Sequence, residues 1–228
     1  SAWLVGSEMC KRGVDWLRLH YAYPAQFPME IMDVMAGHTN ICNYLDIALQ
    51  HISDPVLTAM RRHISADQTR NLIAEMRRRV PELHLRTTLM VGFPGEGEKE
   101  FQELLDFVSE TRFERMGAFA YCEEDDTWAA KHLPDTISPE VKQERLDRLM
   151  TLQERISSDI QDAKIGKTLR VIIDREEADY YVGRTEWDSP EVDPEVLVEK
   201  TDTLQIGQFY HVKIDSAMPF ELTGRITD

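Results

Sequence analysis

Cysteine is scarce in this sequence, and the placement of the few cysteines excludes one common role. Only three occur in 228 residues, at Cys10, Cys42 and Cys122. An odd number of widely separated cysteines does not form the disulfide framework that holds small secreted domains together. Isolated cysteines are typical of reducing compartments, and we therefore expect a cytoplasmic protein.

Several other patterns are missing. No run approaches the roughly 18 consecutive apolar residues of a membrane span, and no signal peptide opens the chain, so we expect no membrane association. Neither the glycine fingerprint of dinucleotide-binding domains nor a phosphate-binding loop is present. The seven histidines have no metal-ligand spacing. No Ser-His-Asp or Cys-His arrangement can be argued from the sequence.

Positive charge is also in short supply. The chain has 26 Lys and Arg against 41 Asp and Glu, which gives a net charge of −15. Proteins that bind nucleic acids usually carry a basic face, so this balance argues weakly against an RNA or DNA partner and mildly for a basic one. High solubility alone is an alternative explanation of the acidity.

The residues that are present predict an α/β domain. Hydrophobic residues make up 42% of the chain, enough for a buried core. Strand patterns alternate with helix patterns four times, which predicts parallel βαβ units. The predicted strands are 15–20, 44–50, 84–91 and 116–122, and the predicted helices are 29–36, 54–62, 65–80 and 98–111.

A second, smaller domain is predicted after a polar loop at 123–134 and a long helix from Ser138 to Lys164. Beyond Gly166 the pattern changes to short alternating strands at 169–174, 180–185, 195–200, 208–214 and 221–226. Even spacing of five short strands predicts a small barrel of the oligonucleotide/oligosaccharide-binding (OB) type. We therefore place a domain boundary between residues 1–164 and 165–228.

The candidate site is the stretch Arg86–Glu96, a buried strand followed by a turn rich in glycine and proline. A strand, a glycine-rich turn and a helix N-terminus form the place where α/β proteins hold small polar ligands. A tight turn without a ligand explains the same composition equally well. His51 also follows a strand and is a further candidate, whereas Asp125 and Asp126 are better explained as a charged surface loop.

Several motifs, taken in order, resemble the radical S-adenosylmethionine methylthiotransferase family. The resemblance covers nearly all of the chain from Val14, and the order of the motifs is more specific than any one of them. The motifs are Tyr44–Asp54 with Leu57 and Met60–Arg62, then Arg86–Thr88 with Val91–Glu96, then Phe119–Cys122 with Thr127–Ala130, and finally the segment from Ile165 onward, which is similar to the family's C-terminal TRAM domain.

The fold implied by this resemblance is a partial (βα) barrel of the radical S-adenosylmethionine type, containing barrel strands three to six, followed by a small all-β TRAM barrel of OB type. Within the family, Trp16–Pro24 and Gln50–Ser53 are most similar to the branch that modifies a ribosomal protein. The implied activity places a methylthio group on the β-carbon of an aspartate in a small-subunit ribosomal protein. A transfer-RNA methylthiotransferase and a non-catalytic substrate-binding module remain alternatives.

The resemblance implies S-adenosylmethionine and two 4Fe-4S clusters as cofactors, but this sequence has neither of the cysteine sets that hold the clusters. Thiolates are the ligands that iron–sulfur clusters require. We therefore interpret the chain as the C-terminal part of a longer enzyme, and we expect it to be inactive alone and to hold no metal. The cofactor-binding residues implied by position are Gln50, His51, Ser53, Arg86, Val91, Gly92, Phe93, Pro94, Gly95 and Glu96.

The resemblance implies that Arg86 directs its guanidinium at an anionic group, for which the carboxylate of S-adenosylmethionine is the candidate; an ion pair with a neighbouring strand is the alternative. From Gly166 to the end of the chain, 7 Lys and Arg stand against 14 Asp and Glu, a net charge of −7. An acidic barrel should attract a basic ribosomal protein rather than RNA. We therefore expect the TRAM domain to bind the ribosomal protein, with transfer RNA the less favoured partner.

Overall fold

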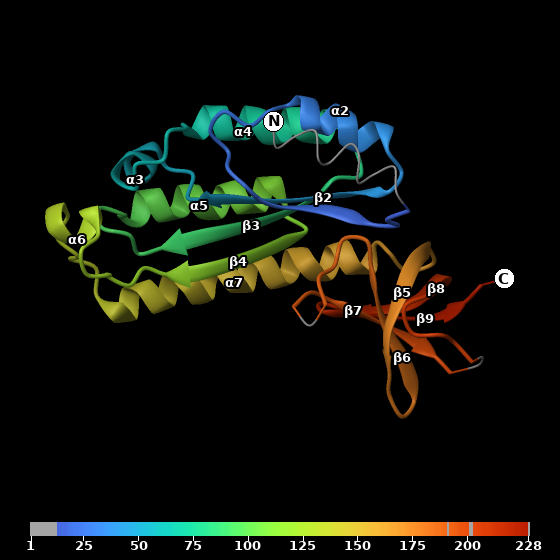
Figure 1. Ribbon diagram of the computed structural model, residues 1–228. Coiled ribbons are helices and arrows are strands. Elements are labelled where there is room, and N and C mark those ends of the chain that lie inside the picture. Colours follow the sequence, from blue (N-terminus) through green and yellow to red (C-terminus); the bar gives the residue numbers. More distant parts are fainter. Residues whose placement is uncertain (1–12, 191, 201–202, 228) are drawn as a thin grey trace. The chain divides into compact units, whose positions relative to one another are not determined.

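The computed structural model describes residues 13–190, 192–200 and 203–227, which form two compact units divided between Gln153 and Glu154. The domain boundary that we predict at residues 164–165 lies eleven residues further along the chain, and it stays a prediction. Each unit is described separately below (Figure 1).

The first unit is built on a four-stranded sheet in which all neighbouring strands are parallel. The spatial order of the strands follows the sequence, as expected for consecutive βαβ units. The strands are β1 (Leu17–Ala22), β2 (Ile41–Gln50), β3 (His84–Val91) and β4 (Arg115–Ala120).

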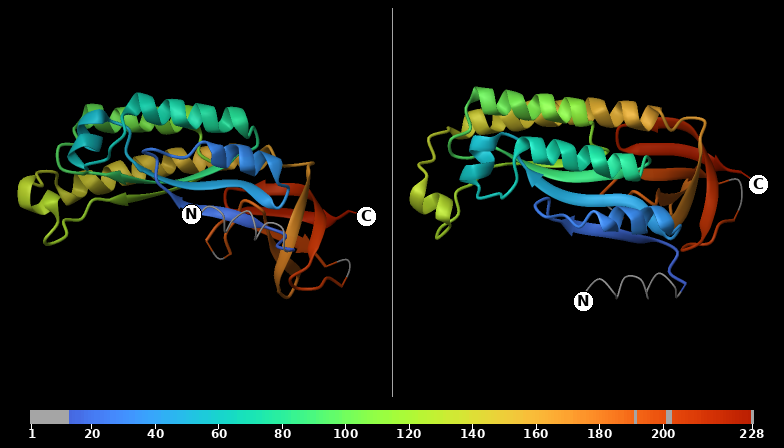
Figure 2. Two further views of the ribbon diagram at one scale, coloured as in Figure 1. Left: turned by 45° about the horizontal axis from the view of Figure 1, so that its top comes forward. Right: turned by 90° about the horizontal axis from the view of Figure 1, so that it is seen from above.

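Helices cover one face of this sheet (Figure 2). Along β3 every second residue is buried, from Leu85 to Val91, while Arg86, Thr88 and Met90 are only half-buried. Alternation of this kind means that one face packs under helices and the other is left more open. The helices of this unit are α2 (Glu30–Gly37), α3 (Asp54–Ala59), α4 (Ala66–Arg79), α5 (Glu98–Thr111), α6 (Trp128–His132) and α7 (Pro139–Asp162), the last of which continues into the second unit.

The local signals in the sequence predict these elements well. The predicted boundaries of β3 and α5 are confirmed without change. The predicted capping box is also confirmed: the Ser65 hydroxyl accepts from the Gln68 N–H, and the Ser65 N–H donates to the Gln68 side chain. Strand β2 begins three residues earlier than predicted.

The prediction of a polar loop at 123–134 is wrong in one respect, because the short helix α6 lies inside it. Its N-cap is Thr127, whose hydroxyl accepts from the Ala130 N–H at 3.2 Å. A helix of five residues is too short to produce the periodic pattern on which the sequence prediction depends.

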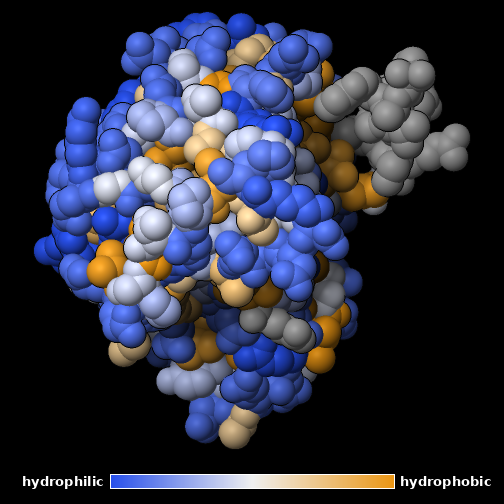
Figure 3. Space-filling view, turned by 90° about the vertical axis from the view of Figure 1, so that its left-hand side faces the viewer, coloured by the Kyte–Doolittle hydropathy of each residue, from blue (hydrophilic) through white to orange (hydrophobic). Residues whose placement is uncertain are grey.

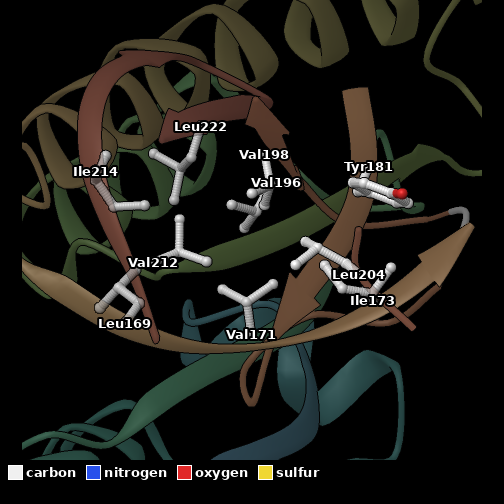
Figure 4. Packing of buried hydrophobic residues seen from close by; sticks show 10 residues of the cluster. All are labelled: Leu169, Val171, Ile173, Tyr181, Val196, Val198, Leu204, Val212, Ile214 and Leu222. Carbon is white, nitrogen blue, oxygen red and sulfur yellow. The ribbon is translucent and has the colours of Figure 1, made fainter. Parts of the chain in front are cut away.

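The second unit contains a closed five-stranded barrel in the order β5-β6-β7-β9-β8, which confirms the predicted small all-β barrel. Ten buried residues fill it, including Val171, Val212 and Leu222, and they converge on its interior (Figure 4). The position of Gly224 excludes any side chain, because an added Cβ would collide with the Lys213 carbonyl of the neighbouring strand. The strands are β5 (Thr168–Glu176), β6 (Tyr180–Thr185), β7 (Glu195–Glu199), β8 (Phe209–Met218) and β9 (Glu221–Ile226).

Candidate functional site

The carboxyl ends of β2, β3 and β4 lie side by side, and the three turns that follow them form one edge of the sheet. Figure 3 looks at this end of the sheet, where mostly hydrophilic residues surround small groups of exposed hydrophobic ones. Ligands of α/β proteins bind at this edge, and the predicted site residues from Gln50 to Ser53 and from Val91 to Glu96 are brought together here.

The turn after β3 depends on its glycines. Gly92 has φ +73° and Gly95 has φ +91°, backbone angles that side chains rarely tolerate. A Cβ at Gly92 would also collide with the side chain of Lys142 on α7. The Glu96 N–H donates to the Phe93 carbonyl at 2.9 Å and closes the turn. Glycine is therefore favoured in this turn by the backbone angles at Gly92 and Gly95 and, at Gly92, by the lack of space for a Cβ.

The Glu96 carboxylate lies at the centre of a buried hydrogen-bond network. Its side chain is 0% exposed. Oε1 accepts from the Gly92 N–H at 2.9 Å and from Arg145 Nη1 at 2.8 Å. Arg145, which belongs to α7, also donates to the Glu96 carbonyl. A buried carboxylate needs donors of this kind, because an unpaired buried charge is strongly destabilising.

His51 completes this network from the turn after β2. Its Nδ1 accepts from the Ser53 N–H at 3.0 Å, and its Nε2 lies 3.1 Å from Glu96 Oε2. An Nδ1 that accepts leaves the ring proton on Nε2, so the hydrogen bonds assign Nε2 as the donor to Glu96. His51 therefore joins the turn after β2 to the turn after β3.

The predicted site residues fall into three groups by exposure. Gln50 and Arg86 are half-buried, and Gln50 has φ +71°, an unusual angle for a residue other than glycine. Gly95 is exposed. The others are buried: His51, Ser53, Val91, Gly92, Phe93, Pro94 and Glu96.

Charged residues line the more open face of the sheet. Arg86 on β3 stands directly beside Asp46 on β2 in the strand register. His20 of β1 lies 3.8 Å from the same aspartate. Burial lowers the pKa of His20, the nearby Arg18 and Arg86 lower it further, and Asp46 opposes them. This face can therefore offer both a carboxylate and a guanidinium to a polar ligand.

Two residues of α7 were missed from the sequence, although both support the strand ends. Lys142 and Arg145 are buried cations three positions apart on one helix. The Lys142 ammonium donates to the Tyr121 carbonyl at 3.2 Å and pairs with Asp135. Burial raises the pKa of Tyr121, which also packs edge-on against Phe93. The sequence signal that could have revealed them is a pair of basic residues on the inner side of the predicted helix.

The iron–sulfur clusters implied by the family do not fit these residues. Within the described parts of the chain, no group of three or more His, Cys, Asp or Glu side chains could hold a metal ion. Cys42 is buried and Cys122 is exposed, while Cys10 lies outside the described residues. No step of a reaction is therefore assigned to a cluster on this chain.

Comparison with protein families divides the chain in two. The model of the radical SAM superfamily matches residues 7–108, and the model of the TRAM domain matches residues 165–227. Coproporphyrinogen III oxidase (HemN) from Escherichia coli, a radical SAM enzyme, superposes on 61% of this chain and 32% of its own, with a TM-score of 0.52 and 18% identity, and so shares the fold. The class is therefore a radical SAM domain followed by a TRAM domain.

The curated relatives define the particular family. The chain is 60% identical over 215 residues to the ribosomal protein uS12 methylthiotransferase RimO of Phocaeicola vulgatus, and 57% identical over 214 residues to that of Parabacteroides distasonis. These matches cover 94% of this chain and 50% of each relative, so the chain spans about half of their length. The chain belongs to the RimO-type radical SAM methylthiotransferase family. Among the described residues, no helix has the length and apolar character of a membrane span.

Proposed function

We propose that this chain is part of an enzyme that transfers a methylthio group to the β-carbon of an aspartate in the small-subunit ribosomal protein uS12. The observation that carries the proposal is the 60% identity to a RimO methylthiotransferase across both domains. An enzyme with this substrate acts where ribosomes are, and we place it in the cytoplasm.

S-adenosylmethionine, bound beside an iron–sulfur cluster, would supply the radical for this chemistry. The cysteine thiolates that hold the two 4Fe-4S clusters are not in this sequence. We propose that they belong to a part of the enzyme outside this chain, and that the chain alone is inactive. Its contribution would be to bind S-adenosylmethionine and the protein substrate.

The residues at the strand ends fit the polar groups of S-adenosylmethionine. Arg86 would receive the carboxylate of the cofactor, and Asp46 offers an acceptor for its amino group. Gln50 would contact the cofactor from the end of β2. The buried residues His51, Ser53 and Glu96 would act indirectly, because they fix the turns that carry the backbone from Val91 to Gly95.

The TRAM barrel is the proposed contact for uS12. Its net charge of −7 from Gly166 onward favours a basic partner. The acidic residues Glu176, Glu177 and Asp179 lie exposed at the hairpin between β5 and β6. Replacing these three with Gln and Asn should weaken uS12 binding, most strongly at low salt.

A chimera tests the proposed activity. The part of the Phocaeicola vulgatus relative outside the matched segment would be joined to this chain and reconstituted anaerobically with iron and sulfide. After incubation with uS12, S-adenosylmethionine, sulfide and a reductant, mass spectrometry should find one methylthio group on an aspartate of uS12. Modification of transfer RNA instead of uS12 would overturn the proposal.

Matched variants test the role of Arg86 in the same chimera. Arg86→Met should reduce S-adenosylmethionine binding, measured by equilibrium dialysis, together with the yield of modified uS12. The control Arg70→Met removes an exposed arginine that pairs with Glu110 on the helical side. Equal effects of the two substitutions would show that Arg86 has no special role at the cofactor.

A further inference from the structure

The strands of the first unit carry mainly positive charge, although the chain as a whole is acidic. Arg86 stands opposite Asp46 on one side and Arg115 on the other in the strand register, so all three belong to the more open face of the sheet. With histidine counted as neutral, strands β1 to β4 have three arginines against one aspartate, a net charge of +2 in a chain of −15. The charged and histidine residues of these strands are Arg18, His20, Asp46, His84, Arg86 and Arg115. The open face is therefore suited to an anionic ligand.

The proposed cofactor does not account for this positive charge. S-adenosylmethionine carries a sulfonium and an ammonium group against a single carboxylate, so it is a cation at neutral pH. Arg86 and Asp46 match its carboxylate and its amino group, and Arg18 has no part in that assignment. The other reactant of the proposed activity is an aspartate, which is anionic at neutral pH. A carboxylate that leaves water needs a cation or hydrogen-bond donors in the site that receives it.

A buried aromatic ring holds Arg18 in place. The Arg18 guanidinium lies 4.9 Å from the centre of the Tyr44 ring on the neighbouring strand β2. Tyr44 is 0% exposed, and His20 packs against the same ring with the two ring centres 5.3 Å apart. Arg18 itself is half-buried. A guanidinium fixed in this way has a defined plane, and its planar set of N–H donors matches the two oxygens of a carboxylate.

Arg18 and Arg86 lie on opposite sides of Asp46. Arg18 belongs to β1 and Arg86 belongs to β3, and β2 runs between these two strands. Neighbouring strands are about 4.8 Å apart, so β1 and β3 are separated by about 10 Å. Two ligands can therefore lie side by side over β2, one held by each arginine, with their reacting groups in contact.

We propose that Arg18 binds the carboxylate of the uS12 aspartate and determines the specificity of the enzyme for an anionic side chain. This inference rests on the proposed function and names the residue that recognises its substrate. In aspartate the carboxyl carbon is bonded directly to the β-carbon, which is the atom to be modified. Two parallel hydrogen bonds to the carboxylate therefore fix the direction of the β-carbon in addition to binding the substrate.

The test compares uS12 with a variant in which asparagine replaces the aspartate that mass spectrometry identifies as modified. Asparagine keeps the shape of aspartate and removes its charge. The reconstituted chimera, with S-adenosylmethionine and without reductant, should bind uS12 roughly tenfold more tightly than the asparagine variant in anaerobic biolayer interferometry. Arg18→Met should bind the two forms equally and give less modified uS12. Equal affinity of the wild-type chimera for the two forms would overturn the proposal.

The matched control is Arg148→Met on α7. The Arg148 guanidinium also lies against a fully buried ring, 4.8 Å from the centre of Phe101, but between the helices α5 and α7. This variant should keep the preference for the aspartate form. Arg18→Lys keeps the charge without the planar donor set and should keep only part of the preference. Loss of the preference in both methionine variants would show that Arg18 has no special role.

Two further measurements separate the substrate from the cofactors. Arg18→Met should bind S-adenosylmethionine within about twofold of wild type in equilibrium dialysis, because a charge about 10 Å away is largely screened. The visible absorbance of the reconstituted iron–sulfur clusters should not change. A loss of cofactor binding or of this absorbance in Arg18→Met would assign Arg18 to a cofactor and overturn the proposal.

The same experiment distinguishes this inference from the function on which it rests. If the wild-type chimera modified no aspartate of uS12, the proposed function and the role of Arg18 would both be wrong. If it modified uS12 while Arg18→Met kept the full preference for the aspartate form, only the role of Arg18 would be wrong.

Discussion

The turn around Glu96 and the interior of the barrel solve the problem of burial in opposite ways. The turn buries a carboxylate, an arginine and a histidine and connects them by hydrogen bonds. The barrel cluster consists of apolar side chains, and most of the barrel's charges face solvent. The first arrangement fixes particular backbone groups in place, whereas the second stabilises a closed shape without directional contacts.

This difference matters for function because the two regions are proposed to do different things. The ends of β2 and β3 must present a cofactor site with defined geometry, and the network through Glu96 determines where Gly92 and the turn after β2 lie. The barrel needs only to hold an outer surface in shape for macromolecular partners. Substitutions in the two regions should therefore differ in how much they lower the free energy of unfolding and in how far their effects spread.

The largest effect is expected for Glu96→Ala. Removing this carboxylate leaves the Arg145 guanidinium without its buried counter-charge and His51 Nε2 without its acceptor, and breaking a buried pair in this way costs about 3–5 kcal/mol. Urea denaturation followed by circular dichroism would measure the loss. The control Glu110→Ala, which removes an exposed acid paired with Arg70, should cost less than about 1 kcal/mol. Similar values for both variants would mean that the network contributes little.

A core substitution in the barrel tests the apolar side of the comparison. Ile214 is 0% exposed, and Ile214→Ala should cost about 2–5 kcal/mol through lost apolar contacts and a residual cavity. Ile206 is 60% exposed, so Ile206→Ala provides the matched control and should change stability little. Hydrogen exchange should show loss of protection in the barrel strands. Loss of protection in β2 and β3 to the same degree would argue against independent stability of the two regions.

The sequence predicts the barrel better than the network around Glu96, because local patterns reveal the barrel strands and do not reveal the partners of Glu96. The boundaries of β3 and α5, the capping box at Ser65 and the five barrel strands are set by neighbours in sequence, so local patterns reveal them. The Glu96 network is not local: His51 is 45 residues away and Arg145 is 49 residues away. The glycines of the turn could be recognised from sequence, but the partners that hold the turn could not.

A smaller effect is expected at the neutral cap of α4. Ser65→Ala removes the hydroxyl that accepts from the Gln68 N–H at 3.2 Å, and a lost N-cap costs about 1 kcal/mol. The control Ser109→Ala, at an exposed position inside α5, should be neutral or slightly stabilising because alanine favours helix. Urea denaturation would resolve the difference. If Ser65→Ala lowered the free energy of unfolding as much as Glu96→Ala, then neutral exposed hydrogen bonds and charged buried ones would contribute equally to stability, which contradicts the comparison.

Glu75 should show the smallest effect, because it is the exposed counterpart of Glu96. Hydrogen bonds from Arg78 and Arg79 lower the pKa of Glu75 from 4.5 to about 2. A carboxyl whose pKa is lower in the folded state stabilises the fold above pH 4.5, and this stabilisation is lost as the pH falls toward 2. Since the group is solvated and screened, stability at pH 7 should hardly change when the exposed Arg78 is replaced by glutamine, although the Glu75 pKa should rise toward its ordinary value. NMR titration of the side-chain carboxyl carbon measures this directly, and a wild-type Glu75 that already titrates near pH 4.5 would show that the hydrogen bonds from Arg78 and Arg79 do not persist in water.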